Sequence, residues 1–171
     1  MVHILELAVS LVFFANKALV LVGRKTGWLL GAIGAILAVF YFYLIDLYVY
    51  TILEAGLIVL MGYGFLKTEK ENRSVENLIR VALALFMLTL AFLTFKGFLT
   101  IVELAGALLM LWGTFLLTHK SETLGWFIYG LAHLCSTYIG YEKGQQTFLD
   151  FQIASAIVCF AGSMRKRRNG Y

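Results

Sequence analysis

Proline is absent from this chain of 171 residues, and charged residues make up only 14% of it. Without proline, no helix is broken or kinked by that residue. The scarcity of charge accompanies 61% hydrophobic residues, which is more apolar surface than a soluble domain of this size can bury. We therefore interpret the sequence as that of an integral membrane protein.

Cysteine is rare, and the common catalytic motifs are missing. Both cysteines, Cys135 and Cys159, lie inside apolar segments, which favours packing as small side chains over a disulfide framework. The sequence has no HExxH, no nucleophile elbow, no phosphate-binding glycine loop after a strand and no Cys/His spacing typical of a metal site. We expect neither an enzyme nor a cofactor or metal. The net charge of +4 does not indicate a nucleic-acid partner, because the basic residues flank apolar segments.

Seven apolar segments of 15–21 residues occur along the chain, and about twenty residues cross a bilayer as a helix. They cover residues 4–22, 27–45, 47–66, 78–95, 98–118, 126–140 and 147–164. The first segment has no basic residue before it and no small-residue cleavage pattern after it, so we expect a retained helix rather than a signal peptide. The hydrophilic stretch 67–77 is interpreted as an aqueous connection. The predicted fold class is an all-α membrane protein with seven transmembrane helices.

The first three segments resemble the last three when the chain is displaced by 98 residues. Identical residues then lie at Leu11, Leu19, Gly27, Trp28, Tyr43 and Gly64. Because six identities are few for so apolar a composition, the prediction rests on the paired Gly-Trp positions and on matching hydropathy.

This displacement predicts two parallel three-helix repeats. We expect a first repeat at 1–66, a cytoplasmic loop and linker helix at 67–96, a second repeat at 97–164 and a basic cytoplasmic tail at 165–171. Three crossings leave the chain on the opposite side of the membrane. The linker helix therefore lets the second repeat start in the same direction as the first.

Basic residues predict the orientation. One side of the predicted topology holds Arg24, Lys25, Lys67, Lys70, Arg73, Arg80, Lys120, Arg165, Lys166, Arg167 and Arg168, and the other holds Lys96 and Lys143. Basic residues stay in the cytoplasm, so we expect a multi-pass protein of the cell (inner) membrane with its N-terminus outside and its C-terminus inside. Lys17 is left over within the first segment. We interpret it as snorkelling to the cytoplasmic interface, with a substrate contact as the alternative.

Two polar side chains inside apolar segments are the main candidates for function. Glu54 lies in the third segment, with Tyr50 four residues earlier on the same helical face, and the 98-residue displacement places Glu54 on Gln152. A carboxylate in a bilayer is costly, at about 2.5–3.5 kcal/mol for a charged residue at a helix centre. The alternative is that both residues only hold neighbouring helices together by hydrogen bonds.

The sixth segment adds a second polar face. Its members follow helical spacing and are Trp126, Tyr129, His133 and Thr137, while the equivalent positions in the second segment are Trp28, Gly31, Ala35 and Val39. Flat rings with imidazole, amide and hydroxyl groups suit a polar, planar ligand. We therefore predict a cavity between the repeats that is polar on one side and smaller and more apolar on the other.

A known family shares these features. The likeness is carried by Trp28 with Gly31, LIDLY at 44–48, Glu54 ten residues before Gly64 in GYGF, Trp126 with Tyr129, YEKGQQT at 141–147, and Gln152 ten residues before Gly162. This pattern, over the whole chain, resembles the PnuC-type vitamin transporters, whose three-one-three architecture is similar to that of the SWEET sugar facilitators. The resemblance implies facilitated uptake of nicotinamide riboside or a similar vitamin, and it makes a homotrimer worth testing.

The chain also departs from that family. The family tends to have Gln in place of Glu54, a second Trp in place of Tyr129, and a Trp after the glycines that here are Gly64 and Gly162. Thiamine, riboflavin precursors and other nucleoside-like vitamins therefore stay open as substrates. Two other functions also stay open: a membrane scaffold without transport, and a proton-coupled symporter that uses Glu54.

Overall fold

The computed structural model describes residues 2–66, 73–118 and 122–167, and all of the regular structure in these residues is helical. The helices are α1 (Val2–Leu21), α2 (Thr26–Leu44), α3 (Tyr48–Leu66), α4 (Arg73–Leu93), α5 (Phe98–Thr118), α6 (Glu122–Glu142) and α7 (Gln146–Arg167). Each predicted apolar segment corresponds to one of them.

Two predicted loops are shorter than expected. The sequence predicts that all of 67–77 is a connection, but α4 already begins at Arg73. Residues 67–72 lie outside the described part of the chain. Likewise α6 begins at Glu122 rather than Trp126, and α7 continues to Arg167, into the predicted tail 165–171, of which residues 168–171 are outside the described part. The reason is that helical backbone bonding continues through polar residues, so an apolar segment marks the membrane-compatible part of a helix and not its ends.

Single residues in the left-handed region reverse the chain between helices. Gly23, Gly97 and Gly144 have φ values of 75°, 92° and 64° at the turns after α1, α4 and α6. Asp46 adopts a φ of 59° after α2, and its Oδ1 accepts a hydrogen bond of 2.7 Å from the Tyr48 hydroxyl. Turns this tight place consecutive helices side by side and antiparallel.

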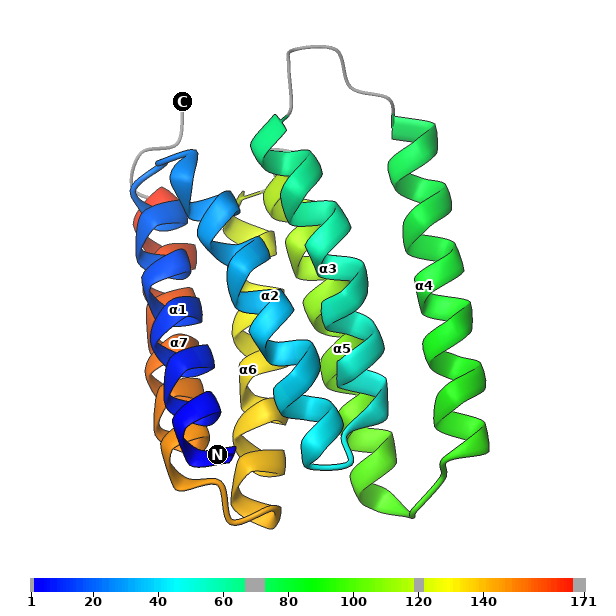
Figure 1. Cartoon of the computed structure of the whole chain (residues 1–171). Coiled ribbons are helices and arrows are strands. Elements are labelled where there is room, and N and C mark those ends of the chain that lie inside the picture. The colour runs from blue at the N-terminus through cyan, green and yellow to red at the C-terminus, as the bar shows by residue number, and fades with distance from the viewer. Residues whose placement is uncertain (1, 67–72, 119–121, 168–171) are drawn as a thin grey trace.

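Six helices form a closed ring, in the order α1, α2, α3, α5, α6 and α7, with α7 returning to α1. The seventh helix, α4, lies outside the ring against α3 and α5 (Figure 1). We refer to α1–α3 as the first triplet and to α5–α7 as the second triplet. The triplets meet along two seams, α1 with α7 and α3 with α5.

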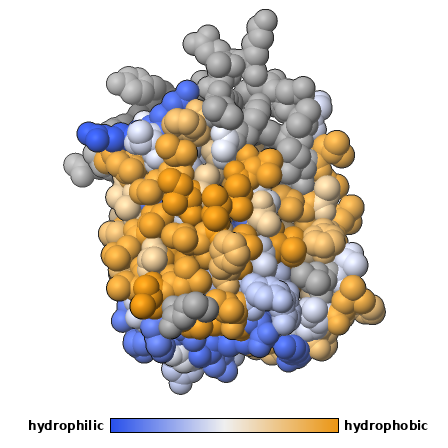
Figure 2. All heavy atoms as spheres, in the orientation of Figure 1, coloured by the Kyte–Doolittle hydropathy of each residue, from blue (hydrophilic) through white to orange (hydrophobic). Residues whose placement is uncertain are grey.

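The outer surface is strongly apolar. Figure 2 shows a broad hydrophobic band across the middle of the molecule with hydrophilic residues along its lower edge. Large exposed apolar side chains include Ile4, Leu11, Phe40, Leu85, Phe92 and Ile157. Four helical stretches among the described residues are long and apolar enough to cross a membrane: Val2–Leu21, Thr26–Leu44, Phe98–Leu117 and Gln146–Met164. These features are compatible with a membrane-embedded protein, while the count of seven crossings stays a prediction.

Candidate functional site

The interior of the ring contains a central cavity with an empty volume of about 350 Å³. All six ring helices contribute to its walls. Its lining residues are Phe13, Lys17, Phe42, Tyr50, Glu54, Leu57, Met110, Tyr129, His133, Ser136, Phe148 and Gln152. Only about 20 Å³ of this space can hold the centre of a water molecule, so in this conformation the cavity has room for about one water.

Two further hollows lead from the central cavity to one end of the bundle. The middle hollow, of about 300 Å³, is lined by Asn16, Lys17, Val20, Trp28, Met61, Thr114, Leu117, Trp126 and Tyr129. It shares Lys17 and Tyr129 with the central cavity. The end hollow, of about 910 Å³, adds the α1–α2 turn from Leu21 to Lys25 and shares both Trp28 and Trp126 with the middle hollow. The three lie in a row along a path from the α1–α2 turn to the centre, and the middle hollow, like the central cavity, has room for about one water.

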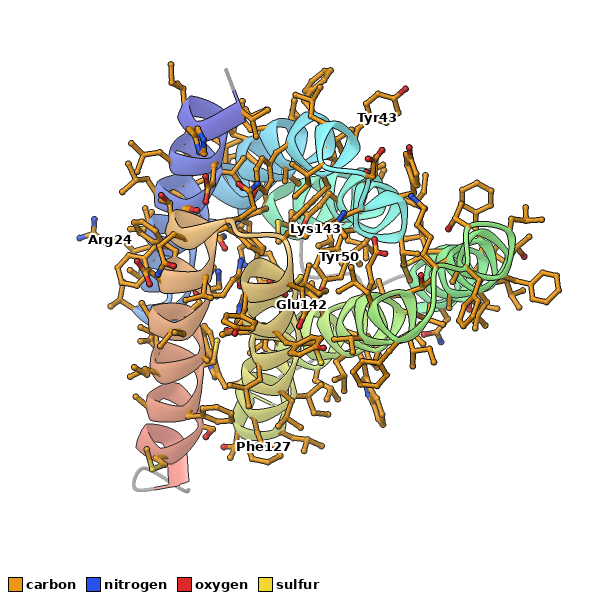
Figure 3. The ribbon with its side chains drawn as sticks, turned by 90° about the horizontal axis from the view of Figure 1, so that it is seen from below. Arg24, Tyr43, Tyr50, Phe127, Glu142 and Lys143 are labelled. Atoms are coloured by element: carbon orange, nitrogen blue, oxygen red, sulfur yellow. The ribbon has the colours of Figure 1, made fainter. Side chains whose placement is uncertain are left out.

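The opposite end of the central cavity is closed by aromatic rings. Phe42 lies edge-on to Tyr50 at 5.1 Å and to Phe148 at 5.7 Å between ring centroids, and Tyr41 packs beside both phenylalanines. We refer to these four residues as the aromatic cluster. All four are buried. In a view from this end, Tyr50 lies toward the middle of the bundle, whereas Tyr43 and Phe127 point away from it (Figure 3).

All seven residues predicted to bind a ligand line this path. Glu54, Gln152, Tyr129, His133 and Tyr50 face the central cavity, and Trp28 and Trp126 face the two hollows that lead to it. Helical spacing explains the grouping, because side chains four residues apart lie above one another on one face. A binding role for them stays a prediction.

His133 and Gln152 join α6 to α7 inside the central cavity. His133 Nδ1 lies 2.5 Å from Gln152 Oε1. An amide oxygen can only accept, so Nδ1 donates, and Nε2 of the neutral ring is left as an acceptor. That Nε2 has no hydrogen-bond partner in the described part of the chain. The Tyr129 ring packs edge-on against the imidazole, with centroids 5.0 Å apart. The imidazole is thus held in one orientation, with its Nε2 acceptor unpaired among the described residues.

Glu54 is 3% exposed, and its Oε2 has no hydrogen-bond partner among the described residues. A buried carboxylate oxygen without a partner costs free energy of folding. The prediction that Glu54 only joins helices by hydrogen bonds therefore accounts poorly for this oxygen. A ligand or water in the cavity would supply the missing donor.

The interpretation of Lys17 as a snorkelling residue is wrong. Lys17 is only 4% exposed and lines both the central cavity and the middle hollow. Side chains of a helix point toward its N-terminus, so the Lys17 stem runs away from the end of α1 at Leu21 and toward Phe13. Its Nζ lies 3.5 Å from the Phe13 carbonyl oxygen and 5.5 Å from the Phe13 ring centroid.

The predicted polar stripe of α6 is corrected at one position. Thr137 does not line the cavity; its hydroxyl donates to the His133 carbonyl at 2.8 Å. Ser136 lines the cavity instead, with its Oγ 3.0 Å from the Tyr50 hydroxyl oxygen. At about 100° per residue, Ser136 lies nearer the mean direction of Tyr129 and His133 than Thr137 does.

The equivalent stripe of α2 is small and apolar, as the sequence predicts. Gly31 occupies the position that matches Tyr129, and a Cβ there would lie 2.5 Å from Met61 Sδ and 2.7 Å from Asn16 Nδ2. These two side chains fill the space that a ring would need. Asn16 is held there because its Nδ2 donates to the Gly27 carbonyl at 2.7 Å.

Two further buried acids are not among the candidates that the sequence analysis selects. Glu6 in α1 and Glu103 in α5 are 1% and 5% exposed. Glu6 Oε1 accepts from the Phe148 backbone N–H at 2.7 Å, and Glu103 Oε1 accepts from the Tyr50 backbone N–H at 3.0 Å. Phe148 and Tyr50 are each the third residue of their helix, where backbone N–H groups lack a partner within the helix.

The two acids occupy nearly equivalent positions in the two triplets, and their spacing in the sequence reflects this. Glu6 and Glu103 are 97 residues apart, one residue less than the displacement of 98 that aligns the triplets. That displacement therefore places Glu6 on Leu104, and the two acids do not align. Each carboxylate completes the N-terminus of the third helix of the other triplet, where the helix dipole also favours negative charge. These bonds lie at the two seams of the ring.

No family model matches the chain, and no significantly similar curated protein or solved structure was found. The likeness to the PnuC-type transporters therefore rests on the sequence motifs alone.

Proposed function

We propose that this protein is a membrane transporter that carries a small nucleoside-like vitamin, such as nicotinamide riboside, down its gradient. The observation that carries the proposal is the buried cavity inside the ring, to which both triplets contribute polar side chains and which a row of hollows joins to one end of the bundle. A static scaffold has no need for uncompensated polar atoms at its centre, such as Glu54 Oε2 and His133 Nε2.

The proposed mechanism is alternating access. In this conformation the hollows open toward the α1–α2 turn, while the aromatic cluster closes the other end. Rocking of the two triplets about their seams would separate Phe42 and Tyr50 from Phe148 and bring Trp28 and Trp126 together. Solute then passes between the triplets without a motor domain, and lipid surrounds the apolar outer surface.

The proposal includes seven crossings with the N-terminus outside. Arg24 and Lys25 are exposed at the open end, which supports a cytoplasmic location for that end. The side chains of the other nine basic residues behind this orientation lie outside the described part of the chain. Single cysteines at residue 2 and near the tail, on a background without Cys135 and Cys159, test it with an impermeant thiol reagent. Labelling of the tail from outside would overturn the orientation.

The proposed ligand pose uses both halves of the cavity. Rings of Trp28, Trp126 and Tyr129 would stack against a heterocycle, and Gln152 and His133 would bind its polar edge. The central cavity is narrow, so a solute the size of a nucleoside requires the surrounding rings to move apart. A homotrimer remains a prediction that size measurement in detergent can test.

Uptake by purified protein in sealed liposomes tests the function. Labelled nicotinamide riboside, thiamine, riboflavin and nucleosides are supplied outside, and the expected result is saturable uptake of at least one that stops at equal concentrations inside and outside. Protein-free liposomes and the Glu54→Leu variant are the controls. Absence of uptake for every compound would favour the scaffold function instead.

A proton-coupled symporter is the second candidate, and the unpartnered Glu54 Oε2 is the observation that favours it. A carboxyl group facing a transport cavity can carry a proton together with the solute. Accumulation above the external concentration, driven by an acidic exterior, would establish coupling. Uptake that only equilibrates would exclude it.

A further inference from the structure

Two buried acids hold the residues that block one end of the ring. Glu6 Oε1 accepts from the Phe148 backbone N–H at 2.7 Å, at the α1–α7 seam. Glu103 Oε1 accepts from the Tyr50 backbone N–H at 3.0 Å, at the α3–α5 seam. Tyr50 and Phe148 are also members of the aromatic cluster that closes the central cavity. We refer to the two hydrogen bonds as the latches and to this end of the ring as the closed end.

From this arrangement we infer that Glu6 and Glu103 keep the closed end shut, and that both latches must break when that end opens to admit or release solute. The inference rests on the proposed transport function and adds two positioning residues to its mechanism. Each bond needs only a carboxyl oxygen as its acceptor, which a carboxyl group provides with or without its proton.

Each latch joins one triplet to the other. Glu6 belongs to the first triplet and binds the second, whereas Glu103 belongs to the second and binds the first. Their partners are each the third residue of a helix, so both bonds lie near one end of a seam and not at its middle. Rocking that separates the triplets at the closed end therefore stretches both bonds together. A hydrogen bond is lost once its donor and acceptor are more than about 3.5 Å apart.

Two further hydrogen bonds join the triplets at the closed end. The Tyr50 hydroxyl oxygen lies 3.0 Å from Ser136 Oγ, and Lys143 Nζ donates to the Ile45 carbonyl at 2.9 Å. The latches differ from these two because they bind backbone N–H groups at the start of a helix, which have no carbonyl partner within the helix. The acids should therefore contribute most to keeping this end shut.

Removing a latch should favour the open form of the closed end. In the present conformation Tyr50 and Phe148 are each 1% exposed, so a backbone N–H that loses its carboxyl acceptor stays buried and unpaired. When the end opens, water can reach the N–H and replace the acceptor. The cost of the lost bond therefore falls on the closed form alone. Each lost latch should shift the equilibrium toward the open form by about five- to a hundred-fold.

The alternative is that the two acids only complete the helices or mark the pivots of the rocking motion. Their bonds would then persist in both conformations. Removing them would lower the stability of the fold without favouring the opening of either end. A test must therefore compare the two ends of the ring and not stability alone.

Spin labels at matched positions measure both ends of the ring. At the closed end, cysteines replace Tyr43 and Tyr141, which the 98-residue displacement aligns and which are 63% and 71% exposed. Tyr43 points away from the bundle in Figure 3. At the other end, cysteines replace Thr26 and Leu124, which are also aligned and exposed. Each pair is introduced into the full chain without its two native cysteines, and pulsed electron spin resonance in lipid nanodiscs gives the distances.

The double variant Glu6→Leu/Glu103→Leu should move the two ends in opposite directions. Labels at 43 and 141 should gain a longer distance, with a ratio of long to short at least twentyfold above that of the parent pair. Labels at 26 and 124 should gain a shorter distance. Distances that grow at both ends, or change at neither, would overturn the inference. If the double variant does not purify as a monodisperse species, the single variants replace it, each with a shift of at least fivefold.

Glutamine variants test whether the backbone hydrogen bond is the cause. Glu6→Gln/Glu103→Gln keeps an amide oxygen that can accept from each N–H. The ratio of long to short distances should therefore stay within about threefold of the parent value. Opening as complete as in the leucine variant would show that these hydrogen bonds do not hold the end shut.

Asp150→Leu is the matched control. Asp150 is an exposed acid of α7 at the closed end, and its Oδ1 accepts from Gln146 Nε2 of the same helix at 3.0 Å. Because this bond does not join the triplets, its loss should leave the distances at both ends unchanged. If Asp150→Leu opened the closed end as far as Glu6→Leu, the inference would be wrong.

The measurement needs no solute, so it separates the latches from the function on which they rest. If the two ends respond in opposite directions while the liposomes take up no compound, the latches are supported and the transport function fails. If a compound is taken up while the distances do not respond to loss of the acids, transport is supported and the latches are excluded.

Discussion

The two triplets share a framework and differ in what they present to the cavity. Glu6 and Glu103 bind the N-termini of α7 and α3 in the same way, and Trp28 and Trp126 line the same hollows. The cavity-facing positions have diverged, because His133 in α6 corresponds to Ala35 in α2.

This difference separates residues that hold the ring together from residues that select a ligand. Substitutions of the two shared acids should have similar effects in both triplets, whereas substitutions of ligand-facing residues, including the two tryptophans with their different neighbours, should not. The four predictions that follow test this distinction.

Glu54 should give the largest effect, because it is the only carboxylate that lines the central cavity among the described residues. Glu54→Leu should insert and fold but lose uptake completely, since it removes the acceptor. Glu54→Gln makes α3 match α7, which carries Gln152, and should still transport without whatever pH dependence Glu54 confers. Uptake against external pH measures this. If Glu54→Gln does not transport the solute while the wild-type protein accumulates it above equilibrium, the protein is a proton symporter.

Gln152→Ala and Trp126→Ala should weaken binding of the transported solute by about five- to a hundred-fold, as expected for losing one buried hydrogen bond or ring contact. Trp28→Ala, at the matching position of the first triplet, should weaken binding less than Trp126→Ala does. The reason is that Tyr129 and His133 follow Trp126 on the same face of α6, and α2 has no such residues after Trp28. Calorimetry gives the affinities, and size-exclusion profiles show whether the variants stay monodisperse. Unchanged affinity with lower thermal stability would assign these residues to the framework.

Glu6→Leu and Glu103→Leu should lower the free energy of unfolding by similar amounts, about 1–3 kcal/mol each. Each leaves a buried backbone N–H without its acceptor. Glu6→Gln and Glu103→Gln should cost less, because the amide oxygen can still accept. Thermal unfolding in detergent compares the four variants. A large loss in one triplet and none in the other would show that the two seams are not equivalent.

Gly31→Ala should give the smallest effect, about 1 kcal/mol of stability. The added Cβ meets the end of the Met61 side chain, which can move aside, and Asn16 Nδ2, which can shift only by lengthening its hydrogen bond to the Gly27 carbonyl. Solute affinity should stay within about threefold of wild type, because Gly31 does not line the central cavity. A tenfold loss of affinity would place α2 closer to the ligand than its small side chains indicate.

The sequence allowed the helices and the main polar residues to be predicted. Apolar segments of membrane-crossing length located all seven helices, since burial in lipid imposes that length. Glu54 and Gln152 were found because a polar side chain in such a segment is costly and therefore conspicuous.

The direction in which each helix faces could not be predicted in the same way. The sequence shows how far Lys17 lies from the end of its helix, but it does not show to which side of the helix the Lys17 side chain points. Lys17 was therefore assigned to the membrane interface. The choice between Ser136 and Thr137 depends on a rotation of one residue. Glu6 and Glu103 bind backbone groups of distant helices, and backbone partners leave no pattern of side-chain types in the sequence.

The hydrogen bond from Phe148 to Glu6 also constrains how the chain is made. Its two partners are 142 residues apart, so at about 5–20 residues per second the ribosome synthesises the start of α7 roughly 7–28 s after the start of α1. During that time the Glu6 carboxylate sits in a helix that has already been synthesised, without the amide that will finally bind it. The first triplet is therefore incomplete when it leaves the ribosome, and a chain whose synthesis stops before α7 keeps a buried carboxylate oxygen without the backbone donor that pairs with it in the finished ring.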